Sequence, residues 1–265
     1  MFDRFSAYQP ASMLGARPSL SRKIVSTVLA GALTMAATSL HPEVAQAKNR
    51  YALEPANVEA KRAFQYAGLA SDACLKELDA RHFPYRRIEA TKQVDTPLRL
   101  TGPIHGVDFK LSARAEKNPD PTSSAAVFDC RLGLALDDLA TELAAHDVVR
   151  AEYLSMYRTR GVGFVKPGKR HPAGLAIDLA TVTRKDGTTF SVYADWHGRV
   201  GSKTCGEGAA KPTKDTEGAR FLREIVCDLS DKGSFNLLLT PHYDWGHRDH
   251  FHMEVRTKIR WFLTQ

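Results

Sequence analysis

An aspartate stands in the middle of an apolar run in the second half of the chain. Asp178 lies in the segment Ala-Ile-Asp-Leu-Ala, which is predicted to form a short strand after a turn containing Pro172 and Gly174. An ionised carboxylate in a strand that is apolar on both sides must be paired or bound to a metal, because burying an isolated charge is very unfavourable. The fold therefore has to bring a cationic partner, or further metal ligands, to this strand.

Histidines at two other places are candidates for those ligands. His171 precedes Asp178 by seven residues, and the small-residue turn between them lets the chain fold back. The segment His-Arg-Asp-His-Phe-His, residues 247–252, contains three histidines and one aspartate. In a strand, the period of two places His250 and His252 on the same face. Two neighbouring strands would then bring His171, Asp178 and His252 together.

Each of these side chains also has an ordinary structural explanation. A lone histidine on a strand is more often a satisfied polar residue than a metal ligand, and a lone buried aspartate is more often hydrogen-bonded to its neighbours. The joint pattern of His-x(6)-Asp followed by His-x-His is much less expected by chance. A catalytic zinc site typically takes three protein ligands and leaves one position for water, and these residues would supply the three.

The start of the chain has the composition of a Sec-type secretory signal peptide. A basic segment at 17–23 precedes an apolar segment at 24–40, and Ala45-Gln46-Ala47 supplies a cleavage site of the A-x-A kind. An uncleaved membrane anchor is the alternative. The Ser, Thr and Gly content of the apolar segment favours cleavage after Ala47 instead.

Cleavage at this position would leave residues 48–265, which we expect to form a single soluble domain that is secreted or periplasmic. No later stretch is apolar for long enough to span a bilayer. Residues 1–47 contain four Lys/Arg and two Asp/Glu, so cleavage takes the formal net charge from +7 to +5. A moderately basic exported protein would be attracted to an anionic polymer of the cell envelope.

Four cysteines remain after the leader, and none of them belongs to a Cys-x-x-Cys pair. In an oxidising compartment an even number predicts two disulfides, for which three pairings are possible. Sequence order favours Cys74–Cys130 and Cys205–Cys227.

Helical and strand-like segments follow one another in an order typical of an α+β domain. Apolar residues recur at helical spacing within 129–146, and residues 214–233 are predicted to form a helix that ends at Gly233. Another helix is expected over 57–80. We therefore predict a central antiparallel sheet flanked by helices. The β-type runs are 149–158, 173–182, 189–196, 235–240 and 250–255, after a region of short strands within 85–111.

Three blocks of the sequence resemble, in the same order, the blocks of the LAS metallopeptidases, which include lysostaphin-type, D-Ala-D-Ala and hedgehog-type domains. "SMYR", residues 155–158, resembles their S-G-Y-R block; "HPAGLAID", residues 171–178, resembles H-x-x-G-x-A-x-D; and "DHFH", residues 249–252, resembles the closing D/E-x-x-H. The fuller ending H-x-D-H-F-H is similar to that of the bacterial extensin-like C-terminal family. The resemblance covers roughly Cys74 to Val255 and implies an LAS-type fold.

The resemblance also implies a role for each motif residue. It makes His171, Asp178 and His252 the ligands of a zinc ion, a set of nitrogen and oxygen donors that suits Zn²⁺. It makes Asp249 our first choice for the general base that takes a proton from the attacking water and gives it to the leaving amine. His250 is then a second base, or a cation beside the oxyanion.

Arg158 matches the family arginine, which could bind a substrate carboxylate or the oxyanion. A surface salt bridge is the alternative for Arg158. His247 fits the extended family ending but has no defined role; it could orient a ligand. Two positions depart from the family pattern: Lys169 replaces the usual serine two residues before the first ligand, and Met156 replaces a glycine.

These expectations combine into a secreted zinc-dependent peptidase that hydrolyses amide bonds of peptidoglycan stem peptides or cross-bridges, as a carboxypeptidase or an endopeptidase. The alternative is a non-catalytic or weakly active cell-wall-binding module that retains the metal-site fold, in which Lys169 crowds the site. A metal-dependent nuclease fits less well, because the sequence contains no basic and aromatic stripe typical of nucleic-acid binding. The expected partner is therefore peptidoglycan or its peptides, without nucleic acid.

Overall fold

The computed structural model of the chain describes residues 49–116, 120, 122–159 and 170–265. They belong to one compact unit, Gln46–Gln265. The predicted signal peptide, residues 1–47, lies outside the described residues. Among the residues described, no helix is both long and apolar enough to cross a membrane.

The single helix expected over 57–80 is interrupted. A 3₁₀ turn, η1 (Val58–Ala60), precedes α1 (Arg62–Gly68) and α2 (Ser71–Ala80), and both helices pack against α3. The backbone between α1 and α2 is extended at Leu69 and Ala70, whose ψ angles are 136° and 157°. Glycine is a poor helix former, so the helix ends at Gly68 and the chain can turn to lay a second short helix on the same neighbour.

The two longest helices form where the sequence predicts them. The N-cap of α3 (Cys130–Ala145) is Asp129, whose carboxylate accepts a hydrogen bond from the Arg131 amide. The N-cap of α5 (Glu217–Lys232) is Thr216. Its C-cap is Gly233, which adopts the left-handed conformation at φ 64°. The apolar residues spaced along α3 are all fully buried: Leu132, Leu136, Leu139 and Leu143.

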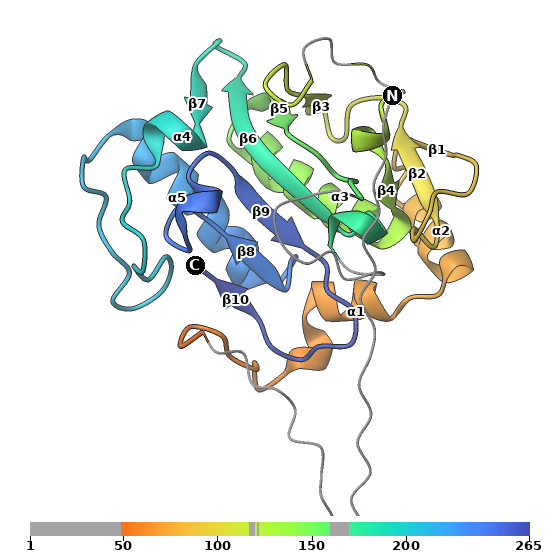
Figure 1. The fold of residues 1–265 in the computed structure, drawn as a ribbon, viewed down its shortest axis with the longest axis horizontal. Coiled ribbons are helices and arrows are strands. Elements are labelled where there is room, and N and C mark those ends of the chain that lie inside the picture. Colours follow the sequence, from red (N-terminus) through yellow and green to blue (C-terminus); the bar gives the residue numbers. More distant parts are fainter. Residues whose placement is uncertain (1–48, 117–119, 121, 160–169) are drawn as a thin grey trace, which may run out of the picture. The chain divides into compact units, whose positions relative to one another are not determined.

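A seven-stranded sheet forms the centre of this unit. Its strand order is β10-β8-β9-β6-β5-β3, and β7 also pairs with β6. α3 and α5 lie behind this sheet in Figure 1, on the same face. The strands are β3 (Asp108–Leu111), β5 (Val148–Tyr153), β6 (Ala176–Arg184), β7 (Thr189–Ser191), β8 (Leu237–Leu239), β9 (Phe251–Glu254) and β10 (Leu263–Thr264).

The sheet is mixed, whereas the sequence predicted an antiparallel one. β5 pairs antiparallel with β6, and β9 pairs antiparallel with both β6 and β8. At the two edges, however, β3 is parallel to β5 and β10 is parallel to β8. The chain between β3 and β5 contains α3, and a helical crossover of this kind is what joins parallel neighbours.

Smaller elements complete the unit. β1 (Tyr85–Arg87), β2 (Pro97–Leu100) and β4 (Phe128–Asp129) form a separate antiparallel sheet. The β-type run predicted over 189–196 is only half a strand, because β7 is followed directly by the short helix α4 (Val192–Asp195).

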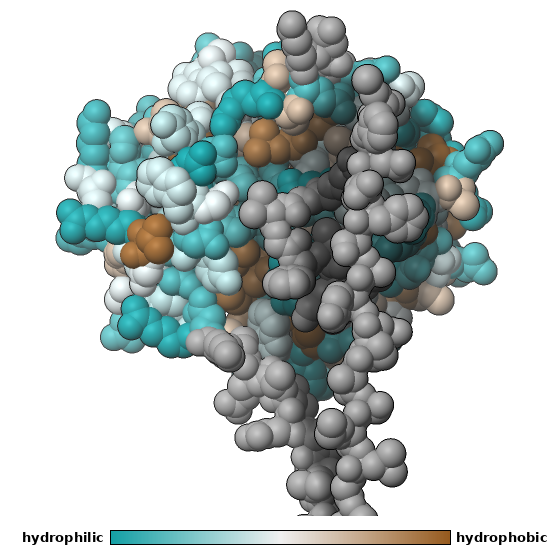
Figure 2. Space-filling view, viewed as in Figure 1, coloured by the Kyte–Doolittle hydropathy of each residue, from teal (hydrophilic) through white to brown (hydrophobic). Residues whose placement is uncertain are grey.

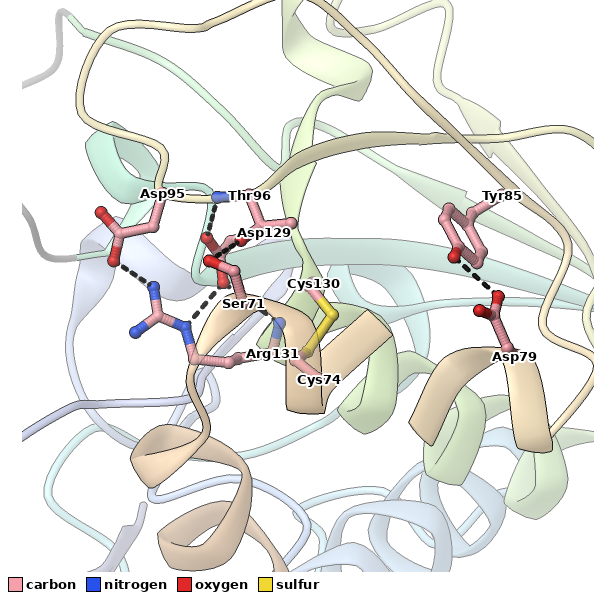
Figure 3. The surroundings of a disulfide bond; sticks show 9 residues. All are labelled: Ser71, Cys74, Asp79, Tyr85, Asp95, Thr96, Asp129, Cys130 and Arg131. Carbon is pink, nitrogen blue, oxygen red and sulfur yellow. Dashed lines mark hydrogen bonds and ion pairs between the residues drawn. A yellow bond between two sulfur atoms is a disulfide. The ribbon is translucent and has the colours of Figure 1, made fainter. Parts of the chain in front are cut away.

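Both predicted disulfides are confirmed. Cys74 in α2 is bonded to Cys130 at the start of α3, and Cys205 is bonded to Cys227 in α5. Figure 3 shows Arg131 beside the first disulfide, where its guanidinium bridges Asp129 and Asp95 at 2.7 Å from each. Two disulfides are consistent with a protein of an extracellular or periplasmic compartment.

Apolar surface is scattered rather than concentrated. Apart from the residues drawn in grey, the face seen in Figure 2 is mostly hydrophilic, with small separate hydrophobic patches. Single exposed apolar residues are normal on a soluble protein. The large apolar side chains that are exposed among the described residues are Leu53, Val149, Tyr193, Val200 and Trp245.

Candidate metal centre

The sheet brings the three predicted ligands to one place. β6 and β9 are neighbours, and their register sets Asp178 directly opposite His252. Phe251 and Met253 belong to the hydrophobic core, as does Ile177 on β6. Because side chains alternate along a strand, Asp178 and His252 therefore point to the opposite face.

His171 reaches the same point from a tight turn. It begins the 3₁₀ turn η3 (His171–Ala173), which Gly174 closes in the left-handed conformation at φ 64° before β6 starts. A Cβ at Gly174 would lie 2.8 Å from the Asp129 amide nitrogen, so only glycine allows this turn to pack so closely against the start of α3. The turn is thus held against the core, and His171 is directed back over β6.

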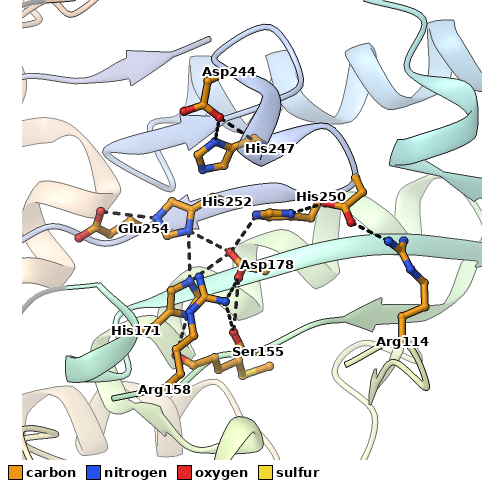
Figure 4. Close-up of polar contacts among 12 residues, drawn as sticks. Arg114, Ser155, Arg158, His171, Asp178, Asp244, His247, His250, His252 and Glu254 are labelled. Atoms are coloured by element: carbon orange, nitrogen blue, oxygen red, sulfur yellow. Dashed lines mark hydrogen bonds and ion pairs between the residues drawn. The ribbon is translucent and has the colours of Figure 1, made fainter. Parts of the chain in front are cut away.

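Three donor atoms converge in this buried site (Figure 4). His171 Nε2 lies 3.1 Å from Asp178 Oδ1 and 3.2 Å from His252 Nδ1, and His252 Nδ1 lies 2.9 Å from Asp178 Oδ1. The three residues are 3%, 0% and 5% exposed. Ligands of tetrahedral zinc, at about 2.0–2.1 Å from the ion, lie about 3.3 Å from one another. The donor set and its spacing therefore fit a zinc ion, which could accept a lone pair from all three atoms at once, whereas a single proton could not.

Each of the three side chains also has a partner on its outer side. His171 Nδ1 lies 3.3 Å from the Met156 carbonyl oxygen, and His252 Nε2 lies 3.8 Å from Glu254 Oε2. Asp178 Oδ2 forms an ion pair with Arg158 Nη1 at 2.9 Å. A proton on each outer ring nitrogen leaves the inner nitrogen as a lone-pair donor, which is how such outer contacts prepare histidines for a metal.

Electrostatics in the metal-free site follow from these contacts. Burial lowers the pKa of His171. Burial alone would raise the pKa of Asp178, but the two imidazoles hold it well below its usual range. Burial also opposes charge on His252, yet the carboxylates of Asp178 and Glu254 raise its pKa to about 9. The metal-free site therefore keeps a proton on His252, and a metal ion bound there would displace it.

Asp249 lies in the turn before β9, as predicted, and its carboxylate is bonded to residues other than the three predicted ligands. Asp249 Oδ1 lies 2.9 Å from His250 Nδ1, and Asp249 Oδ2 is bonded to Arg114 Nη2 at 2.6 Å. His250 presents its other nitrogen, Nε2, at 3.5 Å from Asp178 Oδ1. Both oxygens of Asp249 are thus engaged, one by the neighbouring histidine and one by Arg114, which is 135 residues away in sequence.

Arg158 is anchored at the site rather than standing free on the surface. Its Nη1 contacts Asp178 Oδ2 at 2.9 Å and the Ser155 hydroxyl at 3.1 Å, while its side chain remains 45% exposed. One side of the guanidinium is therefore fixed behind a predicted ligand, and its remaining donors face outward.

His247, which had no defined role, lies beside the other imidazoles. His247 is the last residue of the 3₁₀ turn η4 (Trp245–His247), and Asp244 is the N-cap of this turn. The distance from His247 Nδ1 to Asp244 Oδ1 is 2.7 Å. The ring centroid of His247 is 5.3 Å from that of His250 and 5.8 Å from that of His252. The site thus contains two aspartate–histidine pairs next to the three converging ligands.

The two departures from the family pattern have different outcomes. Met156 is fully buried, and its backbone carbonyl contacts His171. Its side chain therefore fills the core without changing the donor set. Lys169 lies outside the described residues.

A second group of potential ligands, Glu142, His146 and Asp228, lies between α3 and α5. Here Lys232 already forms an ion pair with Glu142 and supplies the positive charge. A nearby ammonium opposes the binding of a metal cation, so this group does not resemble the first.

Comparison with known families gives one match. A family model described as "Extensin-like protein C-terminus" matches residues 72–264, which include all the residues of the site. No curated protein and no solved structure matches the chain.

Proposed function

Since the chain belongs to the extensin-like C-terminus family, we propose for it the activity that its buried donor cluster supports best, that of a zinc-dependent peptidase. The observation that carries the proposal is the convergence of His171 Nε2, Asp178 Oδ1 and His252 Nδ1 within 3.2 Å of one another. Two nitrogens and one oxygen are a donor set typical of catalytic zinc, in which the fourth position of the ion takes water. The proposal includes the LAS-type architecture that the motifs resemble.

In this proposal His171, Asp178 and His252 hold the ion. Zinc held there would polarise a carbonyl and lower the pKa of water, which would supply a nucleophile at neutral pH. His250 accepts the proton of the attacking water at Nε2 and delivers it to the leaving amine. Asp249 accepts a hydrogen bond from His250 Nδ1, which fixes the ring and leaves Nε2 free for this transfer.

Arg158 supplies positive charge on the same side as Asp178. Its inner nitrogen is bonded to Asp178 Oδ2, and the half-exposed remainder of the guanidinium can donate to an oxyanion or to a substrate carboxylate. The Asp178 contact preorganises the guanidinium, so little side-chain freedom is lost when it binds an anion.

We further propose that the substrate is the stem peptide or cross-bridge of peptidoglycan, and that the protein is secreted or periplasmic. The motif resemblance and the predicted signal peptide, cleaved after Ala47, support this assignment by association. The two disulfides independently support a location outside the cytosol, since disulfides persist where the compartment is not reducing.

A second candidate is a cell-wall-binding module that holds the metal without turnover. The replacement of the family serine by Lys169 favours it, because the sequence loses a hydroxyl and gains a cation near the first ligand.

Mass spectrometry of muropeptides tests the proposal. Purified sacculi are incubated with the protein spanning residues 48–265, with and without a chelator, and with His171→Ala as a control. The peptidase is expected to release peptides that are absent from both the chelated sample and the variant. Metal-bound protein that sediments with sacculi but releases nothing supports the binding module. Release that survives both chelation and His171→Ala refutes the metal mechanism.

A further inference from the structure

A buried glutamate behind the third ligand has no role in the reaction described so far. We infer that Glu254, together with Arg170, is a positioning pair that sets which nitrogen of His252 faces the metal. The inference rests on the proposed zinc site, and it adds two residues that lie outside the three motif blocks.

Glu254 is an unusual residue for its place in the sheet. It is 0% exposed and lies on β9, between Ala176 of β6 and Leu237 of β8. Neither of its carboxylate oxygens has a hydrogen-bond partner among the described residues. Burying a charge of this kind is costly, and an apolar side chain would fill the same space without that cost. Glu254 therefore needs an explanation other than packing.

The nearest cationic groups identify what Glu254 acts on. Its Oε2 lies 3.8 Å from His252 Nε2, the contact drawn in Figure 4, and 3.9 Å from Arg170 Nε. A carboxylate at this position favours a proton on His252 Nε2. The opposite tautomer would direct an N–H from Nδ1 at Asp178 Oδ1 and His171 Nε2, where it would exclude a cation. Glu254 thus stabilises the tautomer that can bind metal.

Arg170 connects this carboxylate to the first ligand. It immediately precedes His171 and adopts φ 56° and ψ −143°, a conformation that favours glycine. Its carbonyl oxygen accepts hydrogen bonds from the amides of Ala173 and Leu175, which fixes the turn. The chain has an arginine rather than a glycine at this position, and the guanidinium extends toward Glu254. The turn that carries His171 and the strand that carries His252 are therefore linked through one carboxylate.

Zinc affinity measures this role without requiring activity. In competition with a chromophoric chelator, Glu254→Gln keeps the shape of the side chain and is expected to bind zinc about 10–100-fold more weakly, the usual effect of losing an outer carboxylate. The visible absorption of the Co²⁺-substituted variant should also differ from that of the wild type. Glu142→Gln is the matched control, since Glu142 is buried and ion-paired away from the site. It should leave zinc affinity unchanged.

Two substitutions at Arg170 distinguish the contribution of its side chain to zinc affinity from that of its backbone conformation. Arg170→Ala and Arg170→Gly both remove the guanidinium, but only glycine relieves the positive φ. Both are expected to weaken zinc binding by a similar factor, and Arg170→Lys should restore part of it. Wild-type affinity in Arg170→Gly would show that only the backbone matters and would overturn the role of Arg170. This half-exposed residue also keeps the inference testable if Glu254→Gln does not fold.

The outcomes separate this inference from the proposed function. If the wild-type protein binds one zinc and Glu254→Gln has the same zinc affinity and the same Co²⁺ spectrum, the positioning pair is refuted. The proposed metal site is then unaffected. Wild-type protein that binds no zinc overturns the proposed function, and the inference with it.

Discussion

Asp249 Oδ1 accepts a hydrogen bond from His250 Nδ1 at 2.9 Å, and the two side chains form one unit beside the ligand cluster. Arg114 holds the other oxygen of Asp249, so both carboxylate oxygens are engaged and one of them is bonded to the His250 ring. The sequence alone favoured Asp249 as general base. The geometry favours His250 in that role, with Asp249 as the residue that positions it.

Substitution of these two residues tests which one transfers the proton. His250→Ala should keep zinc and lower turnover by about 10²–10⁴, the contribution of a general base. Asp249→Asn should also lower turnover, because the ring loses its fixed tautomer, and the double variant should be no slower than His250→Ala, since residues that act as a unit are not additive. Turnover measured together with zinc content checks this. If Asp249→Asn abolishes turnover while His250→Ala does not, Asp249 is the base.

Metal content tests the ligand set directly. The protein should bind one zinc per chain, and His171→Ala should lose it, because two donors no longer hold the ion against water. His146→Ala is the control, since His146 belongs to the group neutralised by Lys232. Elemental analysis gives the stoichiometry. Stoichiometric zinc in His171→Ala would show that His171 is not a ligand.

Glycine substitutions test whether close packing positions the first ligand. Gly174 and Gly187 both have positive φ angles, but a Cβ at Gly174 would meet other atoms as close as 2.8 Å, whereas one at Gly187 would meet none within 4 Å. Gly187→Ala should cost about 1 kcal/mol of unfolding free energy for the unfavourable φ. Gly174→Ala should cost at least about 2 kcal/mol and lower zinc affinity, because the turn must move away from α3. Denaturant titration and chelator competition measure the two effects, and equal results for both variants would refute the packing argument.

The buried imidazole of His242 should make stability depend on pH. Burial, with a further contribution from Arg223, lowers its pKa to about 4, against 6.5 for the unperturbed group. Between these values the unfolded chain binds a proton that the folded chain does not. The unfolding free energy should therefore fall by up to about 1.4 kcal/mol per pH unit as the pH drops from 6.5 toward 4. Urea titrations of wild type and His242→Gln at pH 7, 6 and 5 check this. Identical slopes in the two proteins would exclude His242 as the cause.

The disulfides should differ in what they contribute to stability. Replacing either pair with serines should cost about 2–4 kcal/mol, and the loss of Cys74–Cys130 should cost about 0.8 kcal/mol more than the loss of Cys205–Cys227. The reason is the longer loop, with sequence separations of 56 and 22 residues. Non-reducing peptide mapping first verifies the two pairs in the exported protein, and thermal unfolding then ranks the variants. Four free thiols in that map would contradict both the disulfides and the export.

The local pattern of apolar residues was sufficient to predict some helices and strands but not others. The apolar spacing of α3 predicted a helix because all its periodic leucines face one core. The helix over 57–80 was predicted whole, since Gly68 alone does not reveal that two short segments pack separately on α3. β10 has only two residues, too few to form a pattern, and its parallel pairing depends on where distant strands lie.

The candidate site shows the same division. The motif blocks correctly predicted that His171, Asp178 and His252 lie together, because one strand register and one turn are enough to place them. The partner of Asp249 could not be predicted, since Arg114 becomes its neighbour only through tertiary structure. Glu254 did leave a signal: apolar residues, Met253 and Val255, stand on both sides of it, and the same argument about buried charge would have identified it.

The positions of the predicted ligands along the chain have a consequence for the resistance of the protein to proteolysis. Asp178 and His252 are 74 residues apart, a longer separation than either disulfide spans. In the proposed zinc site, an ion held by both would act as a cross-link, and closing a longer loop removes more freedom from the unfolded chain. Withdrawal of the ion would therefore free a long segment to open and be cleaved. The lifetime of the protein among proteases would then follow the supply of metal as well as the oxidation of its thiols.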